Sequence, residues 1–365
     1  MLEWKKLGSV CSFKRGSTIT ARSTVGGNVP VIAGGQTPSY YHNVANRQGE
    51  SITIAGSGAY AGFVAYWNQP IYVSDAFTVE PDNGLLHKYV FHWLKMNQQR
   101  IFGTQKGAGV PHVHGKDIAG FIIPIPSLTE QTRIVDILDT FTASIENLKE
   151  QIAQRRKQYE YYRNQLLDLE GREDRYIKCW GDFCEMNKGN GVQKVNFVES
   201  GKGCIHYGQI YTYYGPYTYI TNKFVSQEVF DAAKKASAGD LIMTDTSENV
   251  EDICKTVAYL GKDDIAVSNH ALIVKHKQNP KFLSYSTQTN SFLNQKRQFV
   301  VGAKVSCIKP AHLSQIKIYL PPLKEQARIV AILDTFEESI ANLEAQLKER
   351  EKQYEYYRNK LLTFE

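Results

Sequence analysis

The sequence predicts an α+β protein in which two mixed α/β globular domains are joined and spaced by two long antiparallel coiled-coil helices with pseudo-two-fold symmetry. Three observations predict it: one segment occurs twice, each copy carries a heptad pattern, and a strand-rich stretch precedes each copy. The 365 residues are enough for two or three domains. We expect four parts in chain order: a globular domain at 1–125, a spacer helix at 126–170, a second globular domain at 171–320 and a second spacer helix at 321–365.

An internal repeat is the strongest signal. Residues 126–170 align without a gap to residues 321–365 at an offset of 195, and roughly two-thirds of the aligned positions are identical. Fainter matches extend upstream and pair 106–110 with 301–305, 73–75 with 267–269, and 7–11 with 180–184. The whole unit of globule and helix is therefore duplicated. Because the helical copies stayed alike while the globules diverged, we infer that the helices do one job twice and that the globules do related jobs on different targets.

Apolar residues in both helical copies follow the alternating four- and three-residue spacing of a heptad seam. In the first copy the seam positions are Ile134, Leu138, Phe141, Ile145, Leu148, Ile152, Arg155, Tyr159, Tyr162, Leu166 and Leu169. In the second copy they are Ile329, Leu333, Phe336, Ile340, Leu343, Leu347, Arg350, Tyr354, Tyr357, Leu361 and Phe364. The single polar interruption in each copy is an arginine, which we expect to set the register or to face a third partner.

No proline or glycine interrupts the heptad stretch of either copy, and each predicts a helix roughly 60 Å long at 1.5 Å per residue. Prolines precede both starts, and Ser127 with Glu130 is a candidate capping box in the first copy. An amphipathic helix of this length needs a partner for its apolar stripe. We favour its twin in the same chain, running antiparallel; the alternative is the same seam of a second chain, which would give a homodimer.

The globular segments are strand-rich with intervening helices. Short apolar runs bounded by glycine or proline predict strands at 51–55, 71–73, 240–244, 256–259 and 271–274. Residues 86–100 predict a helix, and residues 280–295 are typical of helix or turn.

Charge differs between the two kinds of segment. Residues 1–126 carry 11 basic and 6 acidic residues, and residues 171–321 carry 19 and 14, so each has a net charge of +5. Segments 127–170 and 322–365 each have a net charge of −2. The basic globules favour a polyanion as partner, although ordinary surface charge would show the same scatter.

Loop side chains in the globules are the candidate nucleic-acid contacts, because Arg and Lys suit phosphate and guanine whereas Asn and Gln suit adenine edges. The candidates are Gln36, Arg47, Gln48, Lys106, His112, Lys194, Tyr211, Asn249, Lys255, Lys296 and Arg297. Tyr211 belongs to six tyrosines crowded between positions 207 and 219, which would either stack on bases or pack into the core.

Motifs of catalysis are absent from the sequence. It contains no phosphate-binding GxxxxGK[ST] loop, no Asp/Asn-Pro-Pro-aromatic methyltransferase motif and no Gly-x-Ser-x-Gly elbow. Cys179 and Cys184 are the only close pair of the six cysteines, so we expect reduced structural thiols and no metal site. No long apolar run predicts a membrane span, and the N-terminus lacks a signal peptide, so we expect a cytoplasmic protein.

Over nearly its whole length the chain resembles the specificity subunits of type I restriction–modification systems. The resemblance rests on residues 126–139 and 321–334, with the shared text EQxRIVxILD, and on the stretches 4–8 and 107–113. The second globule departs from the first at one point, where Ser306, Cys307 and Ile308 replace Pro111, His112 and Val113, so the role of that loop would differ.

The resemblance implies two target-recognition domains, each recognising one half of a split site in double-stranded DNA, with the helices as a ruler between the halves. It also implies two modification subunits, one per repeat, that methylate adenine using S-adenosylmethionine. Restriction subunits with ATP-dependent translocation, which use ATP and Mg²⁺, would join them. No cofactor and no catalytic residue would belong to this chain.

Two other functions compete with DNA recognition. One is a scaffold whose coiled coil assembles proteins without contacting DNA. The other is a self-sufficient methyltransferase or nuclease, which would modify DNA without added subunits.

Overall fold

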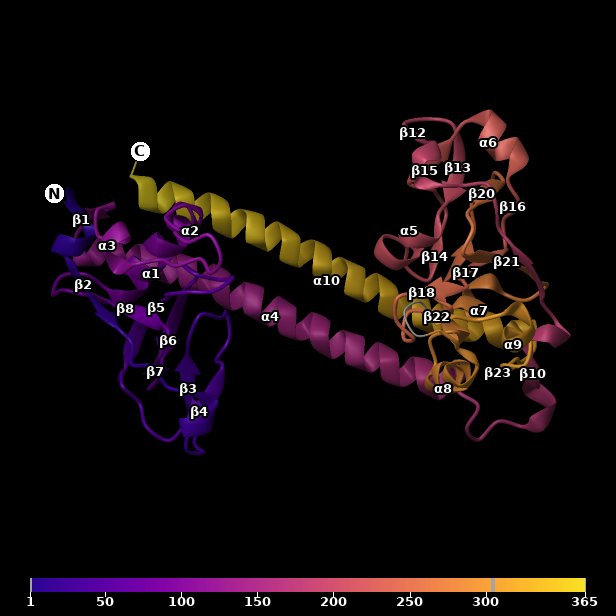
Figure 1. The fold of residues 1–365 in the computed structure, drawn as a ribbon, viewed down its shortest axis with the longest axis horizontal. Coiled ribbons are helices and arrows are strands. Elements are labelled where there is room, and N and C mark those ends of the chain that lie inside the picture. The colour runs from indigo at the N-terminus through magenta and orange to yellow at the C-terminus, as the bar shows by residue number, and fades with distance from the viewer. Residues whose placement is uncertain (1, 303–305, 365) are drawn as a thin grey trace. The chain divides into compact units, whose positions relative to one another are not determined.

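The computed structural model describes residues 2–302 and 306–364, and the chain divides into two compact units. The first comprises Met1–Gln151 and Leu343–Glu365, and the second comprises Ile152–Asn342. Each unit holds one globule together with the beginning of one long helix and the end of the other (Figure 1). The repeat positions at 303–305 lie outside the described residues.

The globule of the first unit is built on a four-stranded antiparallel sheet of order β2-β8-β5-β6, and helix α1 packs on β5 and β6. A three-stranded sheet of order β4-β3-β7 contains the parallel pair β3 and β7, while β1 pairs with β9. The strands are β1 Glu3–Lys6, β2 Cys11–Arg15, β3 Val29–Ile32, β4 Tyr40–His42, β5 Glu50–Ala55, β6 Val64–Asn68, β7 Tyr72–Val73, β8 Ala76–Pro81 and β9 Ile122–Ile125. The helices are α1 His87–Met96, α2 Gln98–Phe102 and α3 Gly115–Ile118, with short 3₁₀ turns at Leu7–Ser9 and Ala21–Ser23.

The globule of the second unit has two five-stranded sheets, of order β11-β21-β17-β19-β14 and β12-β15-β13-β20-β16, and two strand pairs, β10 with β23 and β18 with β22. Its strands are β10 Ile177–Cys179, β11 Glu185–Lys188, β12 Phe197–Val198, β13 Lys202–Ile205, β14 Tyr217–Thr218, β15 Lys223–Val225, β16 Lys235–Ala236, β17 Leu241–Thr244, β18 Thr246–Ser247, β19 Thr256–Tyr259, β20 Ile265–Val267, β21 Ala271–Lys275, β22 Ser306–Cys307 and β23 Lys317–Tyr319. Its helices are α5 Tyr207–Thr212, α6 Gln227–Ala232, α7 Pro280–Ser286, α8 Asn290–Phe299 and α9 Pro310–Leu313, with 3₁₀ turns at Asp174–Tyr176, Trp180–Asp182 and Lys194–Asn196.

The predicted strands all occur, with ends shifted by at most one residue. The helix predicted at 86–100 is divided at Asn97, where α1 ends and α2 begins, and the side-chain amide of Asn97 donates to the Trp93 carbonyl there. The segment 280–295 forms two helices, because the Thr289 side chain accepts from the Phe292 amide and starts α8 there.

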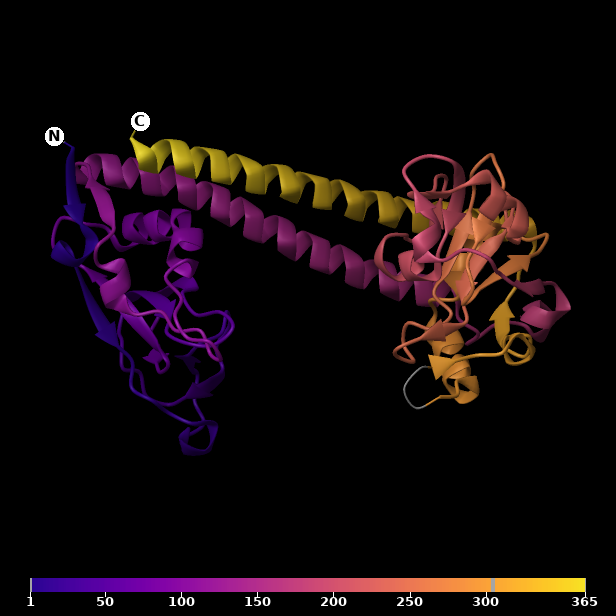
Figure 2. The same ribbon diagram turned by 45° about the horizontal axis from the view of Figure 1, so that its top comes forward.

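The two long helices are α4, Leu128–Leu167, and α10, Leu323–Thr363, and neither is interrupted (Figures 1 and 2). Only half of the predicted capping box forms: the Ser127 hydroxyl accepts from the Glu130 amide at 3.3 Å. The Glu130 carboxylate pairs instead with Arg133 on the same exposed face, which removes it from the helix N-terminus.

In each unit the two helices pack antiparallel. In the first unit Phe141 of α4 stacks on Tyr357 of α10, with ring centroids 5.3 Å apart. In the second unit Tyr162 of α4 stacks on Phe336 of α10 at 5.5 Å. A low-numbered position of one helix therefore meets a high-numbered position of the other in both units, and the partner of each stripe is the twin helix of the same chain.

The arginines in the seam lie over aromatic rings. The Arg155 guanidinium lies 5.9 Å from the centre of the Phe336 ring, and Arg350 lies 5.6 Å from that of Phe141. Both are partly buried, so the ring faces stabilise a charge that would otherwise be costly in an apolar seam.

Burial follows the predicted seam at its start and departs from it at its end. Ile134, Leu138, Ile145, Ile152 and Tyr159 are buried, as are Ile329, Leu333 and Ile340. At the helix ends the buried residues are Leu167 and Leu362, whereas the heptad predicted Leu166, Leu169, Leu361 and Phe364. The reason is that each helix end packs into a globular core rather than along its twin alone, and a 3.6-residue helix drifts from a 3.5-residue pattern.

Candidate nucleic-acid interface

In the first globule a short backbone ladder holds His112 at the surface. Lys106 and His112 exchange both amide–carbonyl hydrogen bonds, at 2.9 and 2.8 Å, and the Val113 amide donates to the Gly56 carbonyl at 3.0 Å. Val113 is buried, whereas His112 is exposed. The ladder therefore fixes the backbone of residue 112 while its side chain faces solvent.

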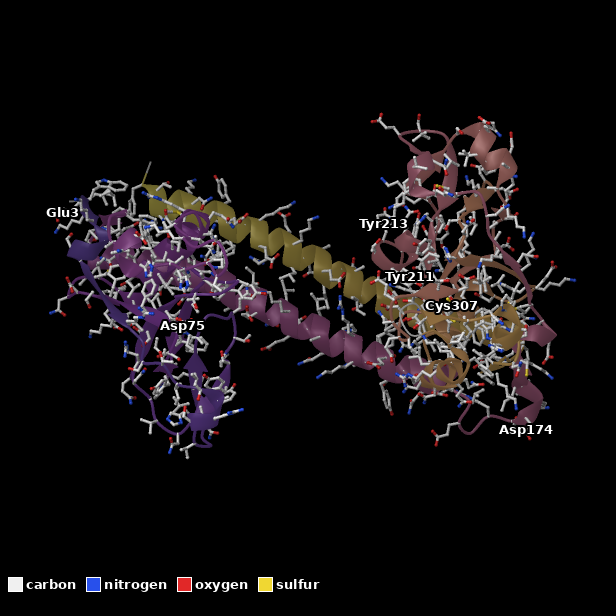
Figure 3. The ribbon with its side chains drawn as sticks, viewed as in Figure 1. Glu3, Asp75, Asp174, Tyr211, Tyr213 and Cys307 are labelled. Carbon is white, nitrogen blue, oxygen red and sulfur yellow. The ribbon has the colours of Figure 1, made fainter. Side chains whose placement is uncertain are left out.

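A cavity of about 220 Å³ lies beside this ladder. Asp75, labelled in Figure 3, lines it and accepts a hydrogen bond from the Ser57 hydroxyl. The same cavity is lined by Arg15, His112, His114 and Lys116. The rings of His112 and His114 are stacked with centroids 6.4 Å apart. A cavity lined by several donors and a carboxylate suits contact with phosphates and base edges.

Three predicted contacts of the first globule gather here. His112 lies on the ladder, and Lys106 is exposed and pairs with Asp117 at 2.6 Å. Gln36 is exposed in a loop that closely approaches the ladder, since a Cβ on Gly34 would lie 2.2 Å from the Ser57 carbonyl oxygen.

The guanidinium of Arg47 is partly exposed and donates within its own globule, and its contact with DNA stays a prediction. Its guanidinium donates to the carbonyls of Lys14 and Arg15, at 3.2 and 3.1 Å, and to Asn46 and Thr78. These bonds tie its loop to strand β2. Its neighbour Gln48 is exposed and stays a candidate.

The equivalent place in the second globule carries a different set of charged groups. Lys188 pairs with the buried Asp245 at 3.0 Å, and the Thr246 hydroxyl donates to the same carboxylate at 2.9 Å. His270, whose φ is 64°, lies 3.2 Å from the Thr246 hydroxyl and packs on the Tyr207 ring. Cys307, labelled in Figure 3, pairs with Thr246 across the β18–β22 ladder.

Tyr211 and Lys255 hold the β18 segment in place. The Tyr211 hydroxyl donates to the Thr246 carbonyl at 2.6 Å, and Lys255 donates to the Tyr211 carbonyl at 3.1 Å. Burial raises the pKa of Tyr211 to about 12, so the phenol stays a neutral donor. Tyr211 therefore supports the backbone, while Lys255 is exposed.

Of the other crowded tyrosines, Tyr214 is buried, whereas Tyr213 and Tyr219 are 57% and 59% exposed. Some tyrosines of the cluster therefore pack into the core, and others lie at the surface.

Lys296 is not a surface contact, and its prediction is wrong. Its side chain is buried, and its ammonium donates to the carbonyls of Glu251 and Ile253 at 2.7 and 2.6 Å. Burial lowers its pKa. The neighbouring Arg297 is exposed but forms two bonds with the Glu251 carboxylate, at 2.9 and 2.8 Å.

The remaining predicted contacts lie at two places on the second globule. Asn249 is exposed and bonds to Asp252 within its own loop. Lys194 is exposed in the 3₁₀ turn before β12. It contributes to the low pKa of His206, which is depressed mainly by burial.

Sequence reasoning missed several residues of the two surfaces: Arg15, Ser57, Asp75, Lys188, Asp245 and His270. The faint repeat that pairs 73–75 with 267–269 contains only one of these residues, Asp75, and no sequence signal marks the others. In the described ranges no group of three or more His, Cys, Asp or Glu side chains is placed to hold a metal ion. Among the helices described, none combines the length and apolar character needed to span a membrane.

Comparison with known proteins identifies the family. The model for the type I restriction modification DNA specificity domain matches residues 1–155 and again 173–352. A putative type I restriction enzyme specificity subunit of Haemophilus influenzae is 27% identical, over 100% of this chain and 96% of its own length. The EcoR124I/EcoR124II specificity subunit of Escherichia coli is 29% identical over 78% of this chain and 72% of its length.

Solved structures show the same fold. The S subunit of a type I restriction-modification system from M. genitalium has a TM-score of 0.65 at 16% identity, covering 99% of this chain and 96% of that one. A chain from a study of assembly and conformational transition in a type I system has a TM-score of 0.58 at 19% identity, with coverage of 99% and 97%. This chain belongs to the type I restriction-modification specificity family and is a non-catalytic DNA-recognition subunit of such a system.

Proposed function

We propose that each globule recognises one half of a split site in double-stranded DNA, so that the complete target is asymmetric. The observation that carries this proposal is the recurrence of one surface ladder, Lys106 with His112 and Val301 with Cys307, with different side chains around it. Two domains that recognise different DNA sequences require this combination of the same backbone arrangement with different contacting side chains.

The long helices set the separation of the half-sites in this proposal. Each globule is anchored to the start of a helix by charged and polar contacts. In the first unit Lys88 and His92 bond to Asp139. In the second unit Lys281 and Tyr285 bond to Asp334, each at 2.8 Å. Because a globule anchored in this way cannot slide along its helix, the helix length of roughly 60 Å would fix the DNA spacer.

We further propose two modification subunits, one on each repeat, with restriction subunits joining them. Exposed tyrosine pairs support this stoichiometry: Tyr161 and Tyr162 are 58% and 44% exposed, and the equivalent Tyr356 and Tyr357 are 60% and 41% exposed. Two identical aromatic patches suit two copies of one partner. S-adenosylmethionine, ATP and Mg²⁺ would belong to those partners, and the cytoplasm, where DNA is accessible, is the proposed location.

Exchange of the first globule tests the proposal. Residues 1–120 are replaced by the corresponding domain of a divergent relative, and the methylated sequences are mapped genome-wide in cells that also make the modification subunits. We expect one half-site to change while the other half and the spacer persist. An unchanged target would favour the scaffold function. The purified chain alone, incubated with DNA and S-adenosylmethionine, is expected to leave DNA unmodified.

A further inference from the structure

The first globule presents the side chain of residue 112 on a fixed backbone. Three main-chain hydrogen bonds, described above, hold the segment from His112 to Val113 against Lys106 and Gly56. The ring nitrogens of His112 have no hydrogen-bond partner in the part of the chain that the structure describes; its ring contact is with His114. This imidazole is thus held in place at its backbone and open at its polar atoms.

The second globule repeats this backbone at an offset of 195. The amides and carbonyls of Val301 and Cys307 pair at 3.0 and 2.8 Å, and the Ile308 amide donates to the Asp245 carbonyl at 3.0 Å. Ile308 is buried as Val113 is. The Cys307 thiol lies 3.9 Å from the Thr246 hydroxyl and is partly exposed.

Side chains around the two ladders fall into a retained set and a changed set. Arg15 and Lys188 end equivalent edge strands, so a cation is retained. Ser57 and Thr246 pair with residues 112 and 307 across the ladder, so a hydroxyl is retained. The ladder residue itself differs, since His112 of the first globule corresponds to Cys307 of the second. The retained hydroxyls donate to Asp75 and Asp245, and Lys188 pairs with Asp245, so the retained set fits support of the ladder. A changed residue on a retained backbone fits sequence discrimination.

We propose that His112 and Cys307 occupy equivalent specificity positions, each contacting a base at the corresponding place of its half-site. This inference rests on the proposed function of the globules. An imidazole can donate to or accept from a purine edge, whereas a thiol is a weak donor that favours apolar contact such as a thymine methyl. The two half-sites would therefore prefer different bases at this one position.

Reciprocal substitution tests the proposal. The complex of this chain with its modification subunits methylates a library of sites randomised in both halves, and the half belonging to each globule is first assigned by the exchange of residues 1–120. We expect His112→Cys to shift the base preference about tenfold at one position of the first half-site only. Cys307→His should do so in the second half-site only.

Val44→Cys is the control, because Val44 is exposed in the same globule and does not line the cavity beside the ladder. We expect this variant to keep the wild-type preference. Unchanged preference in both active reciprocal variants, or a shift in both halves at once, would overturn the inference.

A second variant covers loss of folding. His112→Gln keeps a donor and an acceptor, so it should methylate with a preference of its own even if His112→Cys is inactive. Loss of methylation in both, together with a lowered Tm, would give residue 112 a structural role and overturn the inference. If instead exchange of residues 1–120 leaves the target unchanged, the proposed function itself fails. The domain exchange and the point substitutions thus distinguish the two failures.

Discussion

At the scale of single residues, a charged side chain near a DNA-binding loop is not necessarily a DNA contact. Lys296 and Arg47 resemble surface cations in the sequence, yet both donate to backbone carbonyls of their own globule. Arg15 is not among the contacts predicted from the sequence, although it is exposed beside the cavity at the ladder. The charge of a side chain is known from its residue type. Whether its hydrogen-bond donors already have partners is known only from the tertiary structure.

Lys296→Ala should lower stability and leave DNA affinity unchanged. The substitution leaves the carbonyls of Glu251 and Ile253 without their donor and opens a cavity, so we expect the free energy of unfolding to fall by roughly 2–4 kcal/mol. Urea unfolding and DNA titration of the folded variant measure the two quantities. Weaker DNA binding at unchanged stability would restore Lys296 as a contact residue.

Arg15→Ala should reduce the salt dependence of DNA binding. If the guanidinium contacts one phosphate, the slope of log affinity against log salt concentration becomes smaller by roughly 0.9. Binding isotherms at several salt concentrations measure this slope. Lys5→Ala, which removes a cation paired with Glu3 on β1, is the control and should leave the slope as it is.

At the scale of secondary-structure elements, the attachment of globule to helix is repeated with one change of chemistry. Asp139 bonds to Lys88 and His92, whereas Asp334 bonds to Lys281 and Tyr285. Burial alone would raise the pKa of Asp139, but hydrogen bonds from His92 and Lys88 outweigh it and hold this pKa below its usual value of 3.8. The carboxylate form is therefore the stabilising one.

Asp139→Asn should remove a pH-dependent part of the stability. Because the folded-state pKa is depressed, the contribution is complete well above pH 3.8 and is lost as the pH falls through the lower folded value. We expect the variant to be less stable than wild type by roughly 1–3 kcal/mol at pH 7, with the gap closing in acid. Urea unfolding from pH 7 to pH 2 checks this, and Asp136→Asn on the exposed face is the control. A gap that does not change with pH would contradict it.

At the scale of the whole molecule, the two helices link recognition to spacing. A seven-residue insertion in the 147–157 region of α4 and at the matched point of α10 adds two turns, or roughly 10 Å, and keeps the seam in phase. We expect methylation of targets with a longer spacer. The same insertion in α4 alone should abolish activity, because it moves one seam past the other. A spacer preference that survives the double insertion would show that the helices are not the ruler.

The sequence predicted the organisation better than the contacts. The repeat between 126–170 and 321–365 is recognised by residue identity and does not depend on a prediction of local structure. An uninterrupted heptad pattern predicts a long helix with few alternatives. The surface around His112 and Cys307 depends on loops that meet only after folding, such as those of Gly34 and Ser57. No periodicity connects such residues, so Asp75 and Asp245 escaped prediction. Leu167 and Leu362 escaped because the globules cover them together with the twin helices, and a heptad pattern describes only the helix pair.

The first unit is assembled from both ends of the chain, and this has a consequence for synthesis. Leu362 is fully buried in the same core as Leu138. A ribosome has therefore finished the entire second unit before it delivers the last side chains that the first globule needs. A stop codon anywhere in the stretch that encodes residues 343–365 would therefore remove packing partners of the N-terminal globule, although the codons of that globule are read first.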